Sequence, residues 1–499
     1  MTNYDISHNN IVGNTQYGFY SNVPDQTYTI DYNYRGRTPC PGFVAGPDLG
    51  ADTNTANFVD HFAYTTLNGW LDETTPGANA CIAAPTCYQP QCGQTITGDR
   101  KLCENLSCPD TDVALYMDAN STLDGSGFTI TPKAGTPAIW IVNKNNVTLK
   151  NVKLQGTNNA GNGILLYAQG NQTIENLMLD NVTINNFSNG FYAGYTYLKN
   201  ATVKNSHFDN NGNGFYVNND VENLTLTDNT FNNNTDYGLT LNNYQTAGKV
   251  LNAASSNNSF DGSNYGLYLI GKMNGSIIDG TYTFGNNKNV ALQVAASDVT
   301  LKDLTLQGIN DGGVGVKIMI NSAAQTLENL TIDNVTAKNF SIGLGSRYTT
   351  LKNSTIINSH FDNNAGHGLY FGYAPSVYNL KLANNTFLNN AEYGMYLENA
   401  QTTDPVLTVD SLNNDVSGSR FGLYLIGPMN GLTVDNTTFS FGNNKAVALQ
   451  VASNDLTVKN LTLQGVNDGG HGIMLSLNSS TQTLENLTID NVTANNFSV

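Results

Sequence analysis

The sequence repeats itself at two nested lengths, and this repetition limits what the chain can fold into. The stretch from Asp298 to Gly308 returns from Asp455 to Gly465, and an earlier copy runs from Asn146 to Gly156, so long units recur roughly every 155 residues. Inside each long unit, an Asn, Asp or Gly before a small and an apolar residue recurs at steps of 22 to 31 residues. A unit of this size cannot bury an apolar face alone, so the short period predicts a solenoid.

The local pattern identifies the kind of solenoid. Residues 175–184 and 328–337 alternate apolar and polar side chains with period two and are rich in β-favouring types. Helical spacing is absent, and Asn and Gly inside every unit disfavour helices. The sequence therefore predicts an all-β fold, a parallel β-helix with the right-handed crossovers usual for parallel strands, preceded by an irregular Cys/Pro-rich N-terminal segment.

Asparagine is expected to have two roles in this fold. It tolerates the left-handed backbone of tight turns, and stacked inward asparagines can hydrogen-bond along the axis to backbone that water cannot reach. Several asparagines at the repeat anchors, among them Asn181, Asn334 and Asn491, are predicted to point inward.

Composition divides the chain into three regions. Ten of the 13 prolines and all six cysteines lie before residue 138. Residues 6–20 align without gaps to residues 226–240, which predicts an isolated β-helix-type rung at 1–21. An irregular Cys/Pro-rich linker or small subdomain is expected at 22–91. The β-helix is expected at 92–499, with long repeats at about 138–290, 291–447 and, in part, 448–499.

Charge and hydropathy exclude two classes of partner. The chain has 22 Lys and Arg against 39 Asp and Glu, a net charge of −17, and no basic run. Nucleic acids and anionic membrane surfaces both need clustered cations. No apolar stretch approaches the roughly 18 residues of a membrane-spanning helix. We therefore expect no nucleic-acid partner and no membrane span.

The cysteines favour disulfides over a metal site. Their number is even, no Cys-x-x-Cys motif occurs, and the segment is Pro-rich and irregular. Any of the 15 pairings remains open. The disulfide candidates are Cys40, Cys81, Cys87, Cys92, Cys103 and Cys108.

Dense Asn-x-Ser/Thr motifs predict glycosylation of an exposed rod, although the coil itself also requires Asn before Thr or Ser. The glycosylation candidates are Asn105, Asn120, Asn146, Asn171, Asn200, Asn223, Asn329, Asn353, Asn436, Asn460 and Asn478.

Three segments carry a family resemblance. Residues 92–99 (CGQTITGD), 102–109 (LCENLSCP) and 121–130 (STLDGSGFTI) resemble the opening of secreted right-handed β-helix repeat proteins of the pectate-lyase-like and NosD-like kind. The resemblance covers about residues 92–499. It implies the β-helix fold and an extracellular or cell-surface location. The functions in this group span adhesins, sheath or filament proteins, and polysaccharide lyases, hydrolases and epimerases.

Catalytic motifs of the pectinolytic relatives are incomplete. Residues 366–368 and 470–472 are similar to the Gly-His-Gly of polygalacturonase-like hydrolases, yet the equivalent residues 212–214 read Gly-Asn-Gly. The paired Asp-Asp and the Arg-Ile-Lys of those hydrolases are missing. After residue 138 the only arginines are Arg347 and Arg420, far apart in sequence. We therefore expect no enzymatic activity and no catalytic residue.

Two further binding features have structural alternatives. Asp311 and Asp468, each followed by two glycines, can coordinate Ca²⁺ weakly or simply form turns, so no cofactor is expected beyond that weak calcium site. Tyrosines beside glycine can bind sugar rings or simply stabilise the stacked rungs. These tyrosines are Tyr17, Tyr237, Tyr265, Tyr268, Tyr393 and Tyr424.

The preferred functional hypothesis is an extracellular structural protein, a subunit of a surface fibre, filament or sheath that self-associates head-to-tail through open coil ends and possesses an adhesive face for surface glycans. The alternatives are a polysaccharide-binding or polysaccharide-degrading β-helix enzyme, or a fragment of a larger adhesin. The assembly candidates are Ile6, Ile11, Tyr17, Phe19, Phe497 and Val499.

Overall fold

The computed structural model describes residues 87–499 apart from 168–171, 245–246, 310–311, 320–325, 374–375, 467–468 and 478–483, together with five short strands nearer the N terminus. The chain divides into two compact units, Met1–Tyr88 and Gln89–Val499. In the first unit, β1 (Asn3–Ser7), β3 (Thr27–Asp31) and β5 (Thr65–Asn68) pair in parallel, and β2 (Phe19–Ser21) pairs with β4 (Phe58–Asp60). The predicted boundary between residues 21 and 22 lies outside the described residues.

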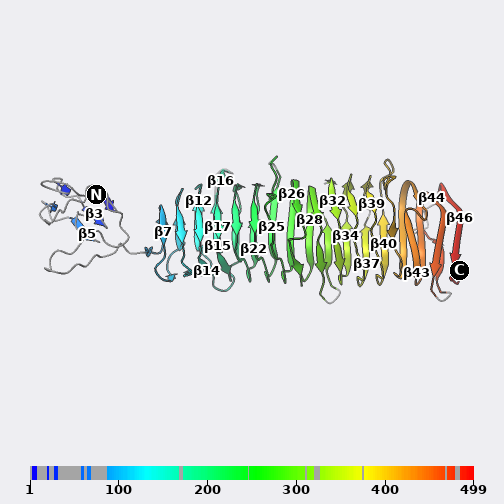
Figure 1. Cartoon of the computed structure of the whole chain (residues 1–499), viewed down its shortest axis with the longest axis horizontal. Helices are drawn as coiled ribbons and strands as arrows, with labels where there is room; N and C mark the ends of the chain where they lie inside the picture. The colour runs from blue at the N-terminus through cyan, green and yellow to red at the C-terminus, as the bar shows by residue number, and fades with distance from the viewer. Residues whose placement is uncertain are drawn as a thin grey trace, which may run out of the picture. The chain divides into compact units, whose positions relative to one another are not determined.

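The second unit is a parallel β-helix, which confirms the predicted fold class. Figure 1 shows its short strands stacked rung on rung from β7 to β46. Every strand pairing in it is parallel, and its described residues contain no helix. None of the described residues forms a helix long and apolar enough to cross a membrane.

One long sheet runs through the whole second unit, and we call it the ladder sheet. It contains β6 (Gln94–Ile96), β9 (Leu115–Met117), β12 (Ile139–Val142), β15 (Asn162–Tyr167), β19 (Asn189–Ala193), β22 (Asn213–Val217), β25 (Tyr237–Asn243), β26 (Tyr265–Ile278), β28 (Val290–Lys302), β30 (Val314–Ile318), β34 (Ile342–Arg347), β37 (His367–Gly372), β40 (Tyr393–Glu398), β42 (Phe421–Val434), β44 (Val447–Gly465) and β45 (His471–Leu475).

The remaining strands form the other faces of the coil. One face contains β7 (Asp99–Lys101), β10 (Thr122–Asp124), β13 (Thr148–Lys150), β17 (Met178–Asp180), β21 (Thr202–Lys204) and β24 (Thr225–Thr227), and further along β32 (Leu330–Asp333), β36 (Thr355–Ile357), β39 (Lys381–Ala383) and β46 (Leu487–Asn495). Another contains β8 (Leu106–Cys108), β11 (Thr129–Pro132), β14 (Lys153–Gln155) and β18 (Thr183–Asn185), then β27 (Phe284–Gly285), β29 (Thr305–Gln307), β33 (Thr336–Lys338), β41 (Asn414–Asp415) and β43 (Phe439–Asn444). Short edge sheets contain β16 (Thr173–Glu175), β20 (Tyr197–Lys199) and β23 (Val221–Glu222), and β31 (Thr326–Glu328), β35 (Thr350–Lys352) and β38 (Val377–Tyr378).

The core is one continuous column of Val, Leu, Ile and Phe inside the coil. Equivalent residues of successive rungs stack directly, as where the rings of Phe191 and Phe215 lie 3.9 Å apart. Phe231 continues a second stack, 5.4 Å from Phe208 and 5.2 Å from Phe260. Burying such rings provides the main driving force for stacking rungs.

Two kinds of asparagine ladder lock the rungs in register. Inside the coil, the side chains of the buried Asn211 and Asn234 bond backbone of the preceding rung. Asn234 Oδ1 accepts the Asn211 N–H at 2.9 Å, and Asn211 Nδ2 donates to the Ile184 carbonyl at 2.9 Å. Outside, Asn181 Nδ2 donates to Asn151 Oδ1 at 2.9 Å. The predicted inward asparagine stack is therefore present, but on a subset of positions.

The orientation predicted for three anchors is wrong. Asn181, Asn334 and Asn491 are exposed and have φ of 56°, 53° and 49°. At these corners the left-handed backbone, which Asn accepts at little cost, turns the side chain outward. The inward positions are filled by other asparagines such as Asn211 and Asn385.

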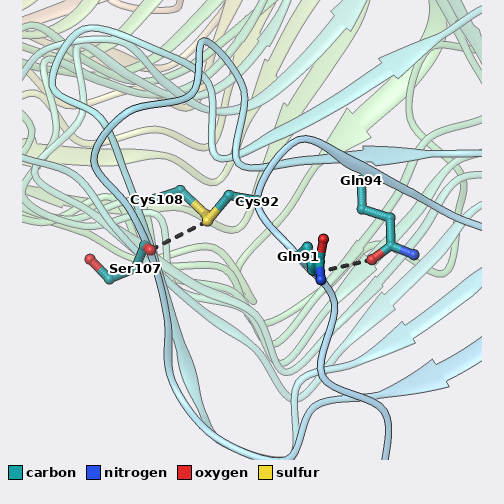
Figure 2. Close-up of a disulfide and its surroundings, with 5 residues drawn as sticks. All are labelled: Gln91, Cys92, Gln94, Ser107 and Cys108. Carbon is teal, nitrogen blue, oxygen red and sulfur yellow. Dashed lines mark hydrogen bonds between the residues drawn. A yellow bond between two sulfur atoms is a disulfide. The ribbon is translucent and has the colours of Figure 1, made fainter.

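The first rungs are joined by a disulfide. Figure 2 shows Cys92, before β6, bonded to Cys108 at the end of β8. Their Cα atoms are 5.4 Å apart. Cys87 and Cys103 are also disulfide-bonded, and the described residues include no free cysteine. Cys40 and Cys81 lie outside the described residues.

Replacing a buried ladder asparagine should destabilise the coil. Asn385 Nδ2 donates to the Ile356 carbonyl at 2.8 Å, and its Oδ1 accepts the Ser359 N–H at 3.0 Å. Asn385→Leu keeps the volume but leaves these buried groups without that partner, so we expect a loss of about 2–5 kcal/mol, measured as a lower denaturant midpoint. The exposed Asn436, which accepts the Thr462 N–H, is the control. If Asn436→Ala costs as much as Asn385→Leu, burial of the ladder is not what stabilises the coil.

Candidate functional site

The ladder sheet presents one outward side chain per strand in a continuous row, which we call the outward ladder. In order its members are Thr95, Tyr116, Trp140, Leu165, Tyr192, Tyr216, Thr240, Tyr268, Gln293, Lys317, Gly345, Tyr370, Tyr396, Tyr424, Gln450 and Met474. Neighbouring rings stack, with centroids 5.7 Å apart for Tyr192 and Tyr216 and 4.7 Å apart for Tyr370 and Tyr396. The face is thus aromatic on both sides of a break at Gln293, Lys317 and Gly345.

All strongly exposed aromatic side chains among the described residues lie along one border of this sheet. They are Tyr167 at the end of β15, Tyr195 just after β19, Tyr244 just after β25, Tyr348 just after β34 and Tyr373 just after β37. We call this set the tyrosine border. Exposed aromatic rings concentrated on one edge are unusual for a solvated surface, and they present planar apolar faces to a ligand.

Two unpaired cations occupy the break in the outward ladder. Lys317 stands on β30 and Arg347 ends β34, and neither forms an ion pair with a described residue. In contrast, Arg420 lies 3.5 Å from Glu392. Burial lowers the pKa of Lys317, and the positive charge of Arg347 lowers it further. Two adjacent cations that form no ion pair with a described residue, in a chain of net charge −17, offer a site for an anionic group, although Glu392 and Glu398 lie close enough to act on His367 and Tyr370.

Aromatic rings hold the Arg347 side chain in place. Its guanidinium carbon lies 5.0 Å from the ring centroid of Tyr373 and 5.6 Å from that of Tyr370. Such cation–π contacts fix the guanidinium while leaving its donors free for a ligand. Gly372 allows the arrangement, because a Cβ there would meet the Tyr370 ring at 2.6 Å. We call Lys317, Gly345, Arg347, His367, Tyr370 and Tyr373 together the cationic centre.

His367 adds a neutral nitrogen to the cationic centre. Burial, opposed by Glu392 and assisted by Arg347, lowers its pKa to about 4. The imidazole stacks on Tyr370 with centroids 4.8 Å apart. Its Nδ1 is buried and has no hydrogen-bond partner among the described residues. At neutral pH this is an uncharged imidazole able to accept a proton or a hydrogen bond from a ligand.

The backbone is strained beside Arg347. Tyr348 and Tyr373 have φ of 55° and 66°, while the other described non-glycine residues with positive φ are Asn, Asp or Ser. A bulky aromatic residue in this region costs on the order of 1–3 kcal/mol, and such strain concentrates at functional sites. The two rings lie 5.1 Å apart and border Arg347.

The long repeat shows that the fold itself does not require the cationic centre. In the first long unit the equivalents of Lys317, Gly345 and Arg347 are Leu165, Tyr192 and Gly194, which are uncharged. His367 corresponds to Asn213 in the same alignment. The same rungs therefore form with neutral residues, and the charges were introduced at one place only.

Sequence reasoning missed this site although it had noticed two of its members. Arg347 was set aside as isolated, and His367 as one choice at a turn position. The available signal was the replacement of neutral residues by charged ones at outward positions of the second long unit. Among the predicted sugar-binding tyrosines, Tyr237, Tyr265 and Tyr393 are half-buried and Tyr268 and Tyr424 are buried. Tyr268 and Tyr424 belong to the outward ladder and the other three flank it, but none of the five presents a strongly exposed ring.

The remaining predicted positions stay untested as functional sites. The described glycosylation candidates are exposed, but Asn146 and Asn223 use Nδ2 to bond Asn120 and Asn200 of the neighbouring rung.

Six of the predicted positions lie outside the described residues: Asn171, Asn478, Asp311, Asp468, Ile11 and Tyr17. Ile6 lies in β1 and Phe19 in β2. Phe497 packs on the core, while Val499 is exposed. No group of His, Cys, Asp or Glu side chains suited to a metal occurs in the part of the chain that the structure describes.

The buried imidazole makes stability depend on pH. Because the folded-state pKa of His367 lies below the ordinary value of about 6.5, the unfolded chain binds more protons as pH falls from about 6.5 to about 4. The stability that comes from keeping His367 neutral is complete above about pH 6.5 and is lost as the pH falls from about 6.5 to about 4. His367→Asn, which copies Asn213, should remove on the order of 2 kcal/mol of this acid sensitivity, measured from denaturant midpoints at several pH values. An unchanged profile for His367→Asn would contradict the buried, neutral state.

Several solved structures share the fold at low identity. The Azotobacter vinelandii mannuronan C-5 epimerase AlgE6 A-module is 15% identical, with a TM-score of 0.30 over 81% of this chain and 91% of its own. The tailspike protein of E. coli bacteriophage HK620, in complex with a pentasaccharide, is 11% identical, with a TM-score of 0.36 over 80% and 72%. The catalytic domain of a GH87 alpha-1,3-glucanase is 12% identical, with a TM-score of 0.29 over 80% and 64%. No curated protein sequence matches the chain.

These similarities correct one expectation. The prediction that the chain is not an enzyme is wrong, because the similar structures include epimerases and a glucanase, and we do not propose it again. At these identities and TM-scores the likeness carries no argument about mechanism, so any activity must be argued from residues of this chain.

A family model described as the right handed beta helix region matches residues 137–275, 248–405 and 376–499. The matches cover more than half of the chain and coincide with the stacked parallel rungs. The chain therefore belongs to the right-handed β-helix family.

Proposed function

We propose that this protein binds an acidic polysaccharide along the ladder sheet and acts on it at the cationic centre. The observation that supports this best is the pair Lys317 and Arg347, which form no ion pair with a described residue and lie at a break between the aromatic stretches of the outward ladder. A carboxylate of the polymer would interact with both cations, and Arg347 offers the forked donors that suit a carboxylate. Neighbouring sugar rings would lie on Tyr348 and Tyr373, which are 58% and 45% exposed.

Removing the two cations should abolish most of the binding. Lys317→Leu with Arg347→Gly copies the first long unit, in which Leu165 and Gly194 stand on intact rungs. Because the polymer then meets no counter-charge, we expect its affinity to fall on the order of 10- to 100-fold. The measurement is titration calorimetry at two salt concentrations with alginate, polygalacturonate and hyaluronan.

The matched control removes two charges elsewhere. Lys153→Leu with Lys338→Ala acts on β14 and β33, away from the ladder sheet. It should leave the affinity unchanged. Equal losses for the two double variants would mean that overall charge, rather than the cationic centre, governs binding, and failure of all three polymers to bind the unaltered chain would overturn the proposal.

The same residues are suited to proton transfer beside a carboxylate. The neutral imidazole of His367 can take the proton from the carbon next to a carboxylate held by Arg347, and the Tyr370 hydroxyl lies beside it as a proton donor. Return of a proton from solvent on the opposite face of the sugar inverts that carbon. Alternatively, breaking the adjacent carbon–oxygen bond releases the next sugar and leaves a carbon–carbon double bond. Burial raises the pKa of Tyr370, which keeps this hydroxyl protonated at neutral pH.

Incorporation of solvent deuterium into the polymer would report this chemistry. We expect NMR to detect deuterium at the carbon next to the carboxylate with the unaltered protein. His367→Asn should lower the rate at least about tenfold while changing affinity little, because general-base catalysis contributes on the order of 10²- to 10⁴-fold. An ultraviolet-absorbing unsaturated sugar would identify elimination instead of inversion. If deuterium exchange is unchanged in His367→Asn, this residue is not the base.

The proposal also covers the location of the protein and its self-association. The disulfide Cys92–Cys108 suits an oxidising compartment, so we place the protein outside the cytoplasm. Head-to-tail self-association into a fibre is compatible with the same binding face, because the ladder sheet lies along the side of the coil. Light scattering on the purified chain tests it.

A further inference from the structure

We propose that Tyr195 and Tyr244 form a second glycan-binding subsite for the same polymer, so that the protein engages an internal stretch of a long chain and not a chain end. This inference rests on the proposed function, because it assumes that the polymer is held at the cationic centre. Tyr195 and Tyr244 are 64% and 58% exposed, and no other tyrosine of the tyrosine border is more exposed than these two.

Tyr195 is the repeat equivalent of Tyr348, which borders Arg347. The two follow β19 and β34, whose sequences align position by position. The subsite therefore presents the Tyr195 ring at the position that Tyr348 occupies beside the cationic centre, on the same border of the same sheet. A polymer lying along that border meets both in the same orientation.

Rings of the outward ladder lie beside the subsite. The Tyr192 ring lies across Gly194, since a Cβ at Gly194 would meet that ring at 2.7 Å. Tyr192 stacks on Tyr216, whose pKa is raised by burial and by the nearby Tyr192 and Tyr244. Tyr244 is fixed at its backbone, where its N–H donates to Asp220 Oδ1 at 2.6 Å.

The subsite holds sugar rings but has no chemistry of its own. Leu165, Gly194 and Asn213 stand where the cationic centre has Lys317, Arg347 and His367. Without cations or a free imidazole, it can stack on apolar sugar faces and nothing more. In this proposal the Tyr195 and Tyr244 subsite binds the polymer, and the cationic centre carries out the reaction.

The spacing of the two sites sets the length of polymer required. Six successive pairings separate β19 from β34, through β22, β25, β26, β28 and β30. At about 4.8 Å per rung this is about 29 Å. A chain that spans this distance binds both sites at once, and the second contact becomes intramolecular, which raises apparent affinity by a large factor.

The test compares chain lengths in one double variant. Tyr195→Ser with Tyr244→Ser should lower the affinity for alginate polymer roughly 10- to 100-fold while leaving the affinity for alginate di- and trisaccharides unchanged. In the unaltered protein, affinity should rise steeply once the oligomer is long enough to span both sites. Tyr378→Ser, on β38 away from the ladder sheet, is the matched control, and circular dichroism checks that each variant is folded.

Each outcome decides the matter. Unchanged polymer affinity in the double variant, or equal losses for short and long chains, overturns the second subsite while the cationic centre stands. If the unaltered protein binds short alginate oligomers and gains nothing with length, the internal-stretch mode is also overturned. If neither alginate nor the other two acidic polymers binds at all, the proposed function is overturned, and the subsite with it.

Discussion

Register between rungs is the constraint on which the rest of this structure depends. Buried asparagines such as Asn234 and Asn385 bond backbone of a neighbouring rung from inside, while corner asparagines such as Asn181 bond their equivalents from outside. A one-residue slip would leave these amides unpaired within the core and would turn the apolar side chains outward. Each outward side chain therefore lies directly above its equivalent, and a surface pattern can be built residue by residue.

Because register is maintained from inside, the outward face is free to vary. The first and second long units share the same interior but differ at Leu165 and Lys317, at Gly194 and Arg347, and at Asn213 and His367. Three unfavourable features meet at this one place: a half-buried lysine beside an arginine, an imidazole nitrogen without a partner, and aromatic residues with left-handed backbone. Because the scaffold forms without them, their meeting at one place supports the proposal that a ligand compensates for their cost.

The sequence predicted the fold better than the site for a physical reason. Period-two alternation in residues 175–184 reflects burial on one side of a strand, which is local, so the parallel coil followed from it. Inward and corner asparagines cannot be separated in this way, since Asn211 and Asn181 sit in similar polar, turn-rich contexts and differ only in backbone φ. His367 and Arg347 are 20 positions apart in sequence, and only the pairing of β34 with β37 brings their surroundings together. The sequence shows the substitutions at these positions between the two long units, but only the register shows that they meet at one site.

The acidity of the chain and a preference for an acidic polymer are compatible because electrostatic forces here are short-ranged. At physiological ionic strength, exposed charges are screened beyond about 8 Å, less than two rungs. A polyanion near the ladder sheet thus responds to Lys317 and Arg347 and little to carboxylates elsewhere on the coil. The tyrosine rings on either side of Lys317 and Arg347 are uncharged and do not repel the polymer. Negative charge over the remaining surface then disfavours every other mode of approach, so that it orients the polymer along the one border where aromatic rings and cations coincide.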